Sequence, residues 1–205
     1  MAAEKIAFRD TRFYPVIFMI IITLIFVGIL ATFYHLTRES VIEYREIALK
    51  RMILSVFELP KTAVDKSYSK FITEKSLEKI TYYEARKDNR VLGYCFPISG
   101  SGLWGTIDGL IAVSPDFSRI INIEIVSQNE TPGLGGRITE DWFKKQFKDK
   151  VLILDNEVKE YTLIPENEQK AKLEINQITG ATQSSKAVVD MIYKNMKIIS
   201  KKFRK

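Results

Sequence analysis

The sequence predicts an α+β protein, in which a single N-terminal transmembrane helix is followed by a mixed α+β domain. Two observations support this prediction. Residues 13–36 include no Lys, Arg, Asp or Glu over 24 consecutive positions. The remainder alternates short β-branched and aromatic runs with turn residues and with segments of helical periodicity. At 205 residues and 46% apolar composition, the chain is large enough for one folded domain beyond the apolar segment.

The apolar segment is long enough to cross a membrane. A helix of this length measures about 36 Å, against about 30 Å for the hydrocarbon layer. Its aromatic residues Tyr14, Phe33 and Tyr34 lie near the two ends, where the membrane interface favours them. A cleaved signal peptide is the alternative, but its apolar core has about 7 to 15 residues before a small-residue cleavage site. We therefore expect residues 13–36 to form an uncleaved anchor in the lipid bilayer, preceded by a tail over residues 1–12.

Residues 37–60 are expected to form a juxtamembrane helix, because they carry a rough apolar stripe that ends at Pro60. Charge does not decide which side of the membrane holds the domain, since basic residues lie on both sides of the anchor. These residues are Lys5, Arg9 and Arg12 before it, and Arg38, Arg45, Lys50 and Arg51 after it.

Four short runs in the domain, which is assigned to residues 61–205, predict strands joined by turns. From Ile121 to Ile125 isoleucines alternate with polar residues, so we expect one buried and one solvated face in that strand. The four runs cover residues 79–85, 91–99, 105–113 and 119–127.

Three further elements are expected after these strands. A helix is predicted from Thr139 to Asp149, because its aromatic residues fall on one helical face. A strand pair is predicted over residues 151–164, with its turn at Asp155 and Asn156. The 3.6-residue rhythm of apolar residues then predicts a last helix over residues 181–200.

The composition excludes several classes of protein. One cysteine, Cys95, and one histidine, His35, provide neither an internal disulfide nor a Cys/His cluster, so no metal site is expected. The net charge of +6 is scattered along the chain without an aromatic-basic stripe, so we expect no nucleic-acid partner.

The first candidate site is the hydroxyl-rich run at residues 179–185, at the start of the last predicted helix. Free amide groups and the positive end of the helix dipole favour an anion there, and four hydroxyls add donors for phosphate oxygens. The alternative is that Thr179 or Thr182 merely caps the helix.

The second candidate site is the loop over residues 127–137, which follows the alternating strand. Its three glycines permit positive φ and close backbone approach, and Leu134 offers an apolar surface. Such a loop suits a planar aromatic cofactor, although a plain turn is the alternative. The spacing matches neither a dinucleotide fingerprint nor a P-loop.

The third candidate is Trp104, which lies between glycines in the segment over residues 98–109. Its ring could stack on a π system. A tryptophan buried in the core is the alternative.

Together these loops resemble a known family. The motifs ETPGLGG at residues 130–136 and ITGATQSS at residues 178–185 follow a GLW loop at residues 102–104 and one N-terminal span. This arrangement resembles the FMN-binding flavoprotein subunit of Rnf- and Nqr-type ion-translocating oxidoreductase complexes, the RnfG/NqrC family. Either motif alone is weak evidence for this family, but the two motifs in this order are specific evidence for it.

The resemblance implies a covalently bound FMN whose phosphate is esterified to Thr182. It implies that a separate flavin transferase installs the flavin from FAD, so that Thr182 is an acceptor and not a catalytic nucleophile. It also implies that the domain lies on the periplasmic or extracellular side of the bacterial inner membrane, with the tail in the cytoplasm. Relatives usually carry Asp six residues before the acceptor, whereas this chain has Asn176. If the transferase reads that carboxylate, modification is less efficient here.

On this resemblance, the chain is an electron-transfer subunit, not catalytic alone, that relays electrons through FMN to other membrane subunits of an Rnf or Nqr complex. The alternatives are a flavinylated anchor protein of another extracytoplasmic electron-transfer chain, and a colourless binding or scaffold protein. The expected cofactor-binding residues are Thr182 for the covalent bond, Thr179, Gly180, Ala181, Ser184 and Ser185 for the phosphate, and Glu130, Thr131, Gly133, Leu134 and Trp104 for the ring.

Overall fold

The computed structural model describes residues 13–78, 80–168 and 171–203. The tail predicted for residues 1–12 lies outside these residues. By its internal contacts the chain divides into two units, Met1–Glu46 and Ile47–Lys205. Each unit is described by itself, starting with the N-terminal one.

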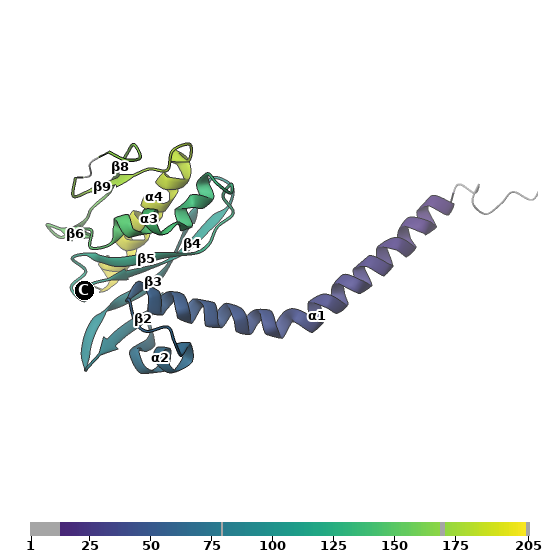
Figure 1. Cartoon of the computed structure of the whole chain (residues 1–205), viewed down its shortest axis with the longest axis horizontal. Coiled ribbons are helices and arrows are strands. Elements are labelled where there is room, and N and C mark those ends of the chain that lie inside the picture. The colour runs from purple at the N-terminus through teal and green to yellow at the C-terminus, as the bar shows by residue number, and fades with distance from the viewer. Residues whose placement is uncertain (1–12, 79, 169–170, 204–205) are drawn as a thin grey trace, which may run out of the picture. The chain divides into compact units, whose positions relative to one another are not determined.

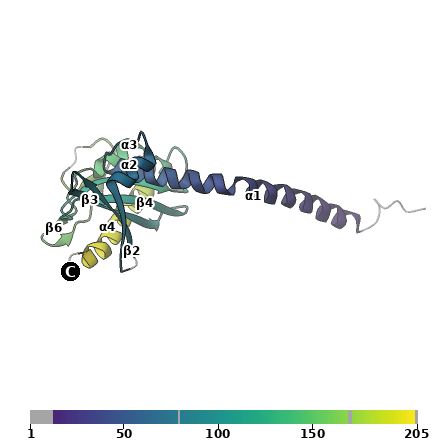
Figure 2. The ribbon, with the colours of Figure 1, turned by 90° about the horizontal axis from the view of Figure 1, so that it is seen from below.

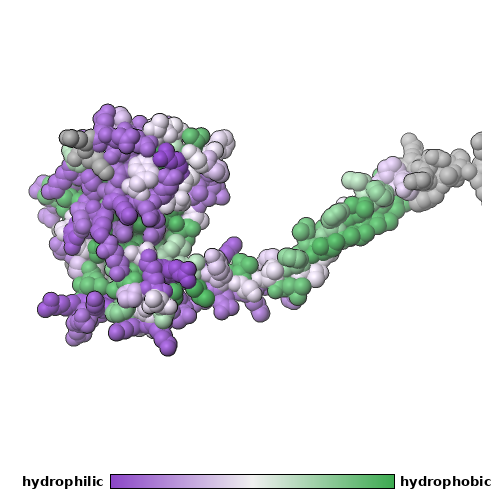
Figure 3. All heavy atoms as spheres, in the orientation of Figure 1, coloured by the Kyte–Doolittle hydropathy of each residue, from purple (hydrophilic) through white to green (hydrophobic). Residues whose placement is uncertain are grey.

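The described part of the first unit belongs to helix α1, which runs without a break from Tyr14 to Val56. The two helices expected for residues 13–36 and 37–60 are therefore one helix, and it ends four residues before Pro60. The most apolar 18-residue window has a mean hydropathy of 3.0 and none of it is buried (Figure 3). The hydroxyl of Thr32 donates back to the carbonyl of Gly28 at 2.8 Å, so this polar group is satisfied inside the helix. By length and composition, α1 can cross a membrane.

The second unit is built on a five-stranded antiparallel sheet in which the strand order follows the chain (Figure 1). Four strands confirm the four predicted runs. The sequence did not indicate helix α2 (Val64–Phe71) or strand β1 (Ile72–Leu77). Strand β1 is polar, and Ile72 has its only buried side chain. The strands are β1 (Ile72–Leu77), β2 (Ile80–Lys87), β3 (Arg90–Ser101), β4 (Thr106–Val113) and β5 (Ile120–Ser127).

The sheet buries side chains on both faces. The last helix, α4 (Thr182–Phe203), lies across one face and packs against β3 (Figures 1 and 2). Because side chains alternate along a strand, Phe96 enters the core beneath α4 while its neighbour Cys95 enters the core on the opposite face. Residues from the end of α1, including Ile53 and Leu54, complete that second core.

The alternation expected for β5 is partly wrong. Ile123 and Ile125 belong to the core beneath α4, but Ile121 packs with the core on the other face. The pairing between β4 and β5 shifts register at Ala112 and Val113, which marks a β-bulge. The extra residue of a bulge reverses the facing of the side chains on one side of it. Both faces of this strand therefore contribute to cores.

The prediction for residues 139–149 is correct for the buried phenylalanines but wrong for the backbone, which does not form one regular helix. Phe143 and Phe147 are fully buried, as the pattern predicts. The backbone of this range, however, forms two short pieces, α3 (Asp141–Lys144) and the 3₁₀ helix η3 (Lys145–Phe147). A further 3₁₀ helix, η2 (Gly135–Thr139), precedes them and reaches the predicted range only at Thr139.

The predicted strand pair is confirmed only near its turn. Strands β6 (Ile153–Leu154) and β7 (Glu157–Val158) form a short hairpin, and both turn residues have positive φ, 56° at Asp155 and 64° at Asn156. The end of the predicted pair is instead a separate strand, β8 (Thr162–Ile164), which pairs in parallel with β9 (Glu174–Asn176). Strand β9 leads directly into the turn before α4.

Candidate functional site

The three motif loops meet at one pocket of about 330 Å³. Eight of the expected site residues line it, whereas Thr179, Gly133 and Ser185 do not. The lining residues are Leu103, Trp104, Glu130, Thr131, Leu134, Gly135, Gly180, Ala181, Thr182, Gln183 and Ser184. A larger pocket of about 610 Å³, between the β6–β7 hairpin and the end of α4, contains none of these residues.

Sheet register explains why loops so far apart in the sequence meet. The GLW loop is the tip of the β3–β4 hairpin, and the ETPGLGG loop follows the end of β5. Asp108, near the start of β4, is paired with Ser127, the last residue of β5. The two loops therefore leave the same end of the sheet, and α4 begins beside them.

The start of α4 offers an anion site. Within the described residues, the amide N–H groups of Thr182, Gln183 and Ser184 have no hydrogen-bond acceptor. Unpaired amides at a helix N-terminus, together with the helix dipole, favour a negatively charged group. The pocket therefore has one end that suits a phosphate.

The alternative role in helix capping is not supported for Thr182. Its side chain is exposed, and its hydroxyl makes no hydrogen bond to any part of the chain that the structure describes. Ser185 does not cap the first helix amides either, because its hydroxyl accepts the Ile178 N–H, which lies before the helix, at 3.0 Å and donates to the Ala181 carbonyl at 3.1 Å. The Thr182 hydroxyl is therefore exposed and has no hydrogen-bond partner among the described residues.

The expectation that four hydroxyls face a phosphate needs correction. Ser185 is fully buried and makes the two bonds just described. Ser184 is 2% exposed and donates to the Glu130 carboxylate at 2.6 Å. Thr179 is bonded to Glu166. Of the four hydroxyls, that of Thr182 alone is unengaged within the described residues.

Glu130 lies at the centre of the site and not on its surface. It is 4% exposed, and one carboxylate oxygen accepts the N–H groups of Leu103 at 2.8 Å and Trp104 at 3.1 Å. The other oxygen accepts the Ser184 hydroxyl. An ionised carboxylate is an acceptor only, so these three donors match it. Glu130, expected to contact a ring, instead joins the GLW loop and the start of α4.

Gly135 is required because the backbone passes close to this carboxylate. A Cβ atom at position 135 would lie 2.8 Å from the Glu130 Oε2 atom and would also collide with the Ser184 hydroxyl. Only glycine permits this approach. Gly180 is needed for a different reason, because its φ of +77° is strained for any residue with a side chain.

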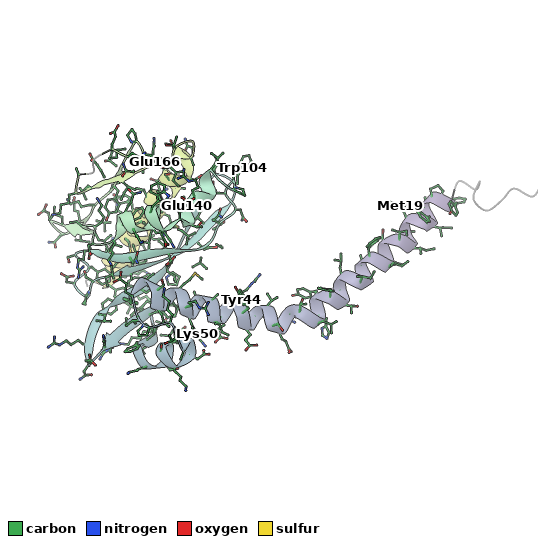
Figure 4. The ribbon with its side chains drawn as sticks, in the orientation of Figure 1. Met19, Tyr44, Lys50, Trp104, Glu140 and Glu166 are labelled. Carbon is green, nitrogen blue, oxygen red and sulfur yellow. The ribbon has the colours of Figure 1, made fainter. Side chains whose placement is uncertain are left out.

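The other end of the pocket is apolar and open. Trp104 is 70% exposed and Leu103 is 58% exposed, so the interpretation of Trp104 as a core residue is wrong. Figure 4 shows Trp104 at the edge of the domain, on the β3–β4 loop. With Leu134, which is also exposed, these side chains form a surface on which a planar ring can stack.

A turn that the sequence did not single out also supports the site. Glu166 accepts the Thr179 N–H at 2.8 Å, and its other oxygen lies 3.4 Å from a guanidinium nitrogen of Arg137. The hydrogen bonds from Thr179, and then the charge of Arg137, lower the pKa of the Glu166 carboxyl. Glu166 stands in a polar stretch without periodicity, so no local signal marks it.

Comparison with known proteins shows what this chain is similar to. Residues 102–197 match the FMN-binding domain. The chain is 40% identical over 110 residues to the G subunit of the proton-translocating ferredoxin:NAD(+) oxidoreductase complex of Clostridium ljungdahlii, covering 54% of this chain and 55% of that protein. It is 32% identical over 141 residues to the G subunit of the Na(+)-translocating ferredoxin:NAD(+) oxidoreductase complex of Acetobacterium woodii, covering 68% and 64%.

The fold has a matching neighbour among solved structures. The C subunit of the Na(+)-translocating NADH-quinone reductase of Parabacteroides distasonis superposes with a TM-score of 0.67 at 22% identity, over 78% of this chain and 94% of that one. The family domain and these relatives make the RnfG/NqrC family the one that this chain resembles. It spans less than two thirds of the length of each of the two ferredoxin:NAD(+) oxidoreductase relatives.

The residues of this chain fit FMN at both ends of the pocket. The unpaired amides of α4 suit the phosphate, and the exposed surface of Trp104, Leu103 and Leu134 suits the isoalloxazine ring. Leu103, Gly135 and Gln183 line the pocket although sequence reasoning did not select them, and all three stand inside the quoted motifs.

Proposed function

We propose that the chain carries FMN as a phosphoester of Thr182. The observation that carries the proposal is the free, exposed hydroxyl of Thr182, next to unpaired helix amides and on the rim of an apolar pocket. The flavin, when bound, supplies one- and two-electron transfer, while the protein supplies the tether and the orientation. Leu103, Trp104 and Leu134 would hold the ring, and the start of α4 would hold the phosphate.

The attachment needs an external enzyme. With FAD as donor, a bond forms between the Thr182 oxygen and the flavin-side phosphorus, the bond from that phosphorus to the bridging oxygen of the diphosphate breaks, and AMP leaves with that oxygen. The hydroxyl proton has to go to a base. Within the described residues, no carboxylate or imidazole is hydrogen-bonded to Thr182, so the flavin transferase supplies that base.

We further propose that this flavin relays electrons between neighbouring subunits of an Rnf- or Nqr-type membrane complex. The names of the relatives support this role, since each is a subunit of an ion-translocating oxidoreductase. The open, apolar end of the pocket would leave the ring accessible to a redox partner. The long apolar part of α1 supports membrane anchoring. The domain is proposed to lie on the outer side of that membrane.

Intact-mass measurement tests the attachment. The chain coexpressed with a flavin transferase should gain the mass of FMN minus one water, and its band should fluoresce after denaturing electrophoresis. Thr182→Ala should lose both signals. Thr131→Ala, which removes another exposed hydroxyl from the same pocket, should keep both. A fluorescent Thr182→Ala band would place the tether on another residue.

A further inference from the structure

Two buried amide side chains lie behind the acceptor turn, away from the pocket. Gln146 and Asn176 are each 6% exposed. The side chain of Gln146 donates to the Asn176 carbonyl at 3.0 Å and accepts the Asn176 N–H at 2.8 Å. Gln146 thus satisfies both backbone groups of Asn176 at the end of β9, as a neighbouring strand would do. This pair fixes the position of Asn176.

The side chain of Asn176 in turn holds the turn at residues 165–168. Its amide nitrogen donates to the carbonyls of Pro165 at 2.7 Å and Glu168 at 3.2 Å, which are the first and last residues of that turn. A side-chain amide has two N–H donors, and this geometry uses both. The buried side chain of Asn176 thus links both ends of the turn, which the Glu168 N–H also closes by donating to the Pro165 carbonyl at 3.4 Å.

The same turn reaches the acceptor segment through Glu166. Its carboxylate accepts the N–H of Thr179 at 2.8 Å, three residues before Thr182. Hydrogen bonds thus connect the buried Asn176, the turn it closes, and the backbone that precedes the free amides of α4. Figure 4 labels Glu166, the member of this connection nearest to Thr179.

We propose that Asn176 is a positioning residue for the loading of Thr182 with flavin phosphate. It acts by holding the turn that carries Glu166, and it does so without contact with the transferase, because its side chain is buried. The proposal rests on the proposed function of Thr182. The proposal distinguishes asparagine from aspartate at position 176, because an aspartate carboxylate has no N–H donor and would face two carbonyl oxygens.

Asn176→Asp is the discriminating variant. The full-length chain in detergent is incubated with flavin transferase and FAD, and the rate of mass gain is measured. We expect a rate about tenfold lower, since small displacements of a reacting group have large effects. The loss should lie in kcat, with KM for the protein substrate unchanged. An equal rate, or an effect confined to KM, would overturn the proposal. A faster rate would also overturn it, because a transferase that reads a carboxylate would prefer the variant.

Asn156→Asp is the matched control. It adds the same charge at the exposed turn of the β6–β7 hairpin, outside the acceptor pocket. This variant should be loaded at the wild-type rate. A slow Asn156→Asp variant would mean that added charge alone explains the effect, and the positioning role would be rejected.

Hydrogen exchange of the apo chain tests the connection without any flavin. In Asn176→Asp and in Glu166→Ala, the Thr179 amide should exchange faster while β3 amides keep their protection. Unchanged protection of Thr179 would overturn the proposal. If Asn176→Asp does not fold, Glu166→Ala decides both arms, since it removes the hydrogen bond to Thr179 and leaves the buried Asn176–Gln146 pair in place. Failure of the proposed function appears separately, as wild-type protein without mass gain.

Discussion

At the scale of single residues, the site depends on a buried carboxylate that the motif does not explain by itself. Glu130 accepts hydrogen bonds from the GLW loop and from Ser184, a residue 54 positions later in the chain. Removing a buried acceptor leaves its donors unsatisfied, which costs more than the hydrogen bonds are worth in net terms. Glu130 should therefore matter for stability as well as for the cofactor.

Glu130→Ala should lower the free energy of unfolding by about 3 kcal/mol, because two amides and one hydroxyl lose their acceptor. Denaturant titration of the chain in detergent micelles, followed by tryptophan fluorescence, measures this change. Thr131→Ala, the neighbouring exposed position, should stay within about 0.5 kcal/mol of the wild type. If both variants are equally stable, Glu130 does not organise the loops.

At the scale of elements, turns show how side chains replace missing backbone partners. In the turn between β4 and β5, Asp116 accepts the Ser114 hydroxyl at 2.6 Å, and the N–H and hydroxyl of Ser118 at 3.1 and 2.9 Å. These bonds, that from Ser114 first, lower the pKa of Asp116 from 3.8 to about 2. The charged form of Asp116 therefore favours the folded state.

This turn makes stability depend on pH. Because the folded-state pKa of Asp116 is lowered, its contribution is fully present above pH 3.8 and is lost as the pH falls through about 2. Ser114→Ala should raise the pKa of Asp116 toward 3.8, as measured by NMR titration of its carboxyl carbon. The difference in Tm between wild type and variant should shrink between pH 5 and pH 2. A pKa that does not move would show that Ser114 is not the main cause.

The start of α4 illustrates the same point for a helix. Ser185, one turn into the helix, satisfies the Ile178 N–H, while the first amides of the helix stay unpaired in the described chain. This short segment thus combines hydrogen bonds that stabilise the domain with unpaired amides that, in our proposal, bind the flavin phosphate.

At the scale of the whole molecule, α1 is one continuous helix that begins with an apolar segment and ends with residues of the folded domain. The described side chains of residues 13–36 are mostly exposed and apolar, which a soluble domain does not need. The domain, by contrast, has two separate apolar cores. These features favour anchoring in a bilayer.

The sidedness of the domain can be tested by cysteine labelling. Cys95 is fully buried, and burial raises the pKa of its thiol, so the wild type should not react with maleimides. Lys87→Cys, at the exposed end of β2, should react with a membrane-impermeant maleimide in intact spheroplasts. Ala3→Cys should react only after permeabilisation. The reverse pattern would place the domain in the cytoplasm.

The sequence by itself determined what depends on local pattern. The long apolar helix, four strands and the last helix follow from uninterrupted apolar length, two-residue alternation and 3.6-residue periodicity, whereas the pocket motifs were marked by their glycines, their hydroxyls and their resemblance to a known family. Tertiary structure decided what depends on partners distant in the chain. The bulge that turns Ile121 to the other face, the carboxylate of Glu130 and the turn held by Asn176 all depend on strand register and on contacts between separate loops. The local sequence pattern does not show such partners, because hydrogen bonds between distant segments form only after the sheet has brought those segments together.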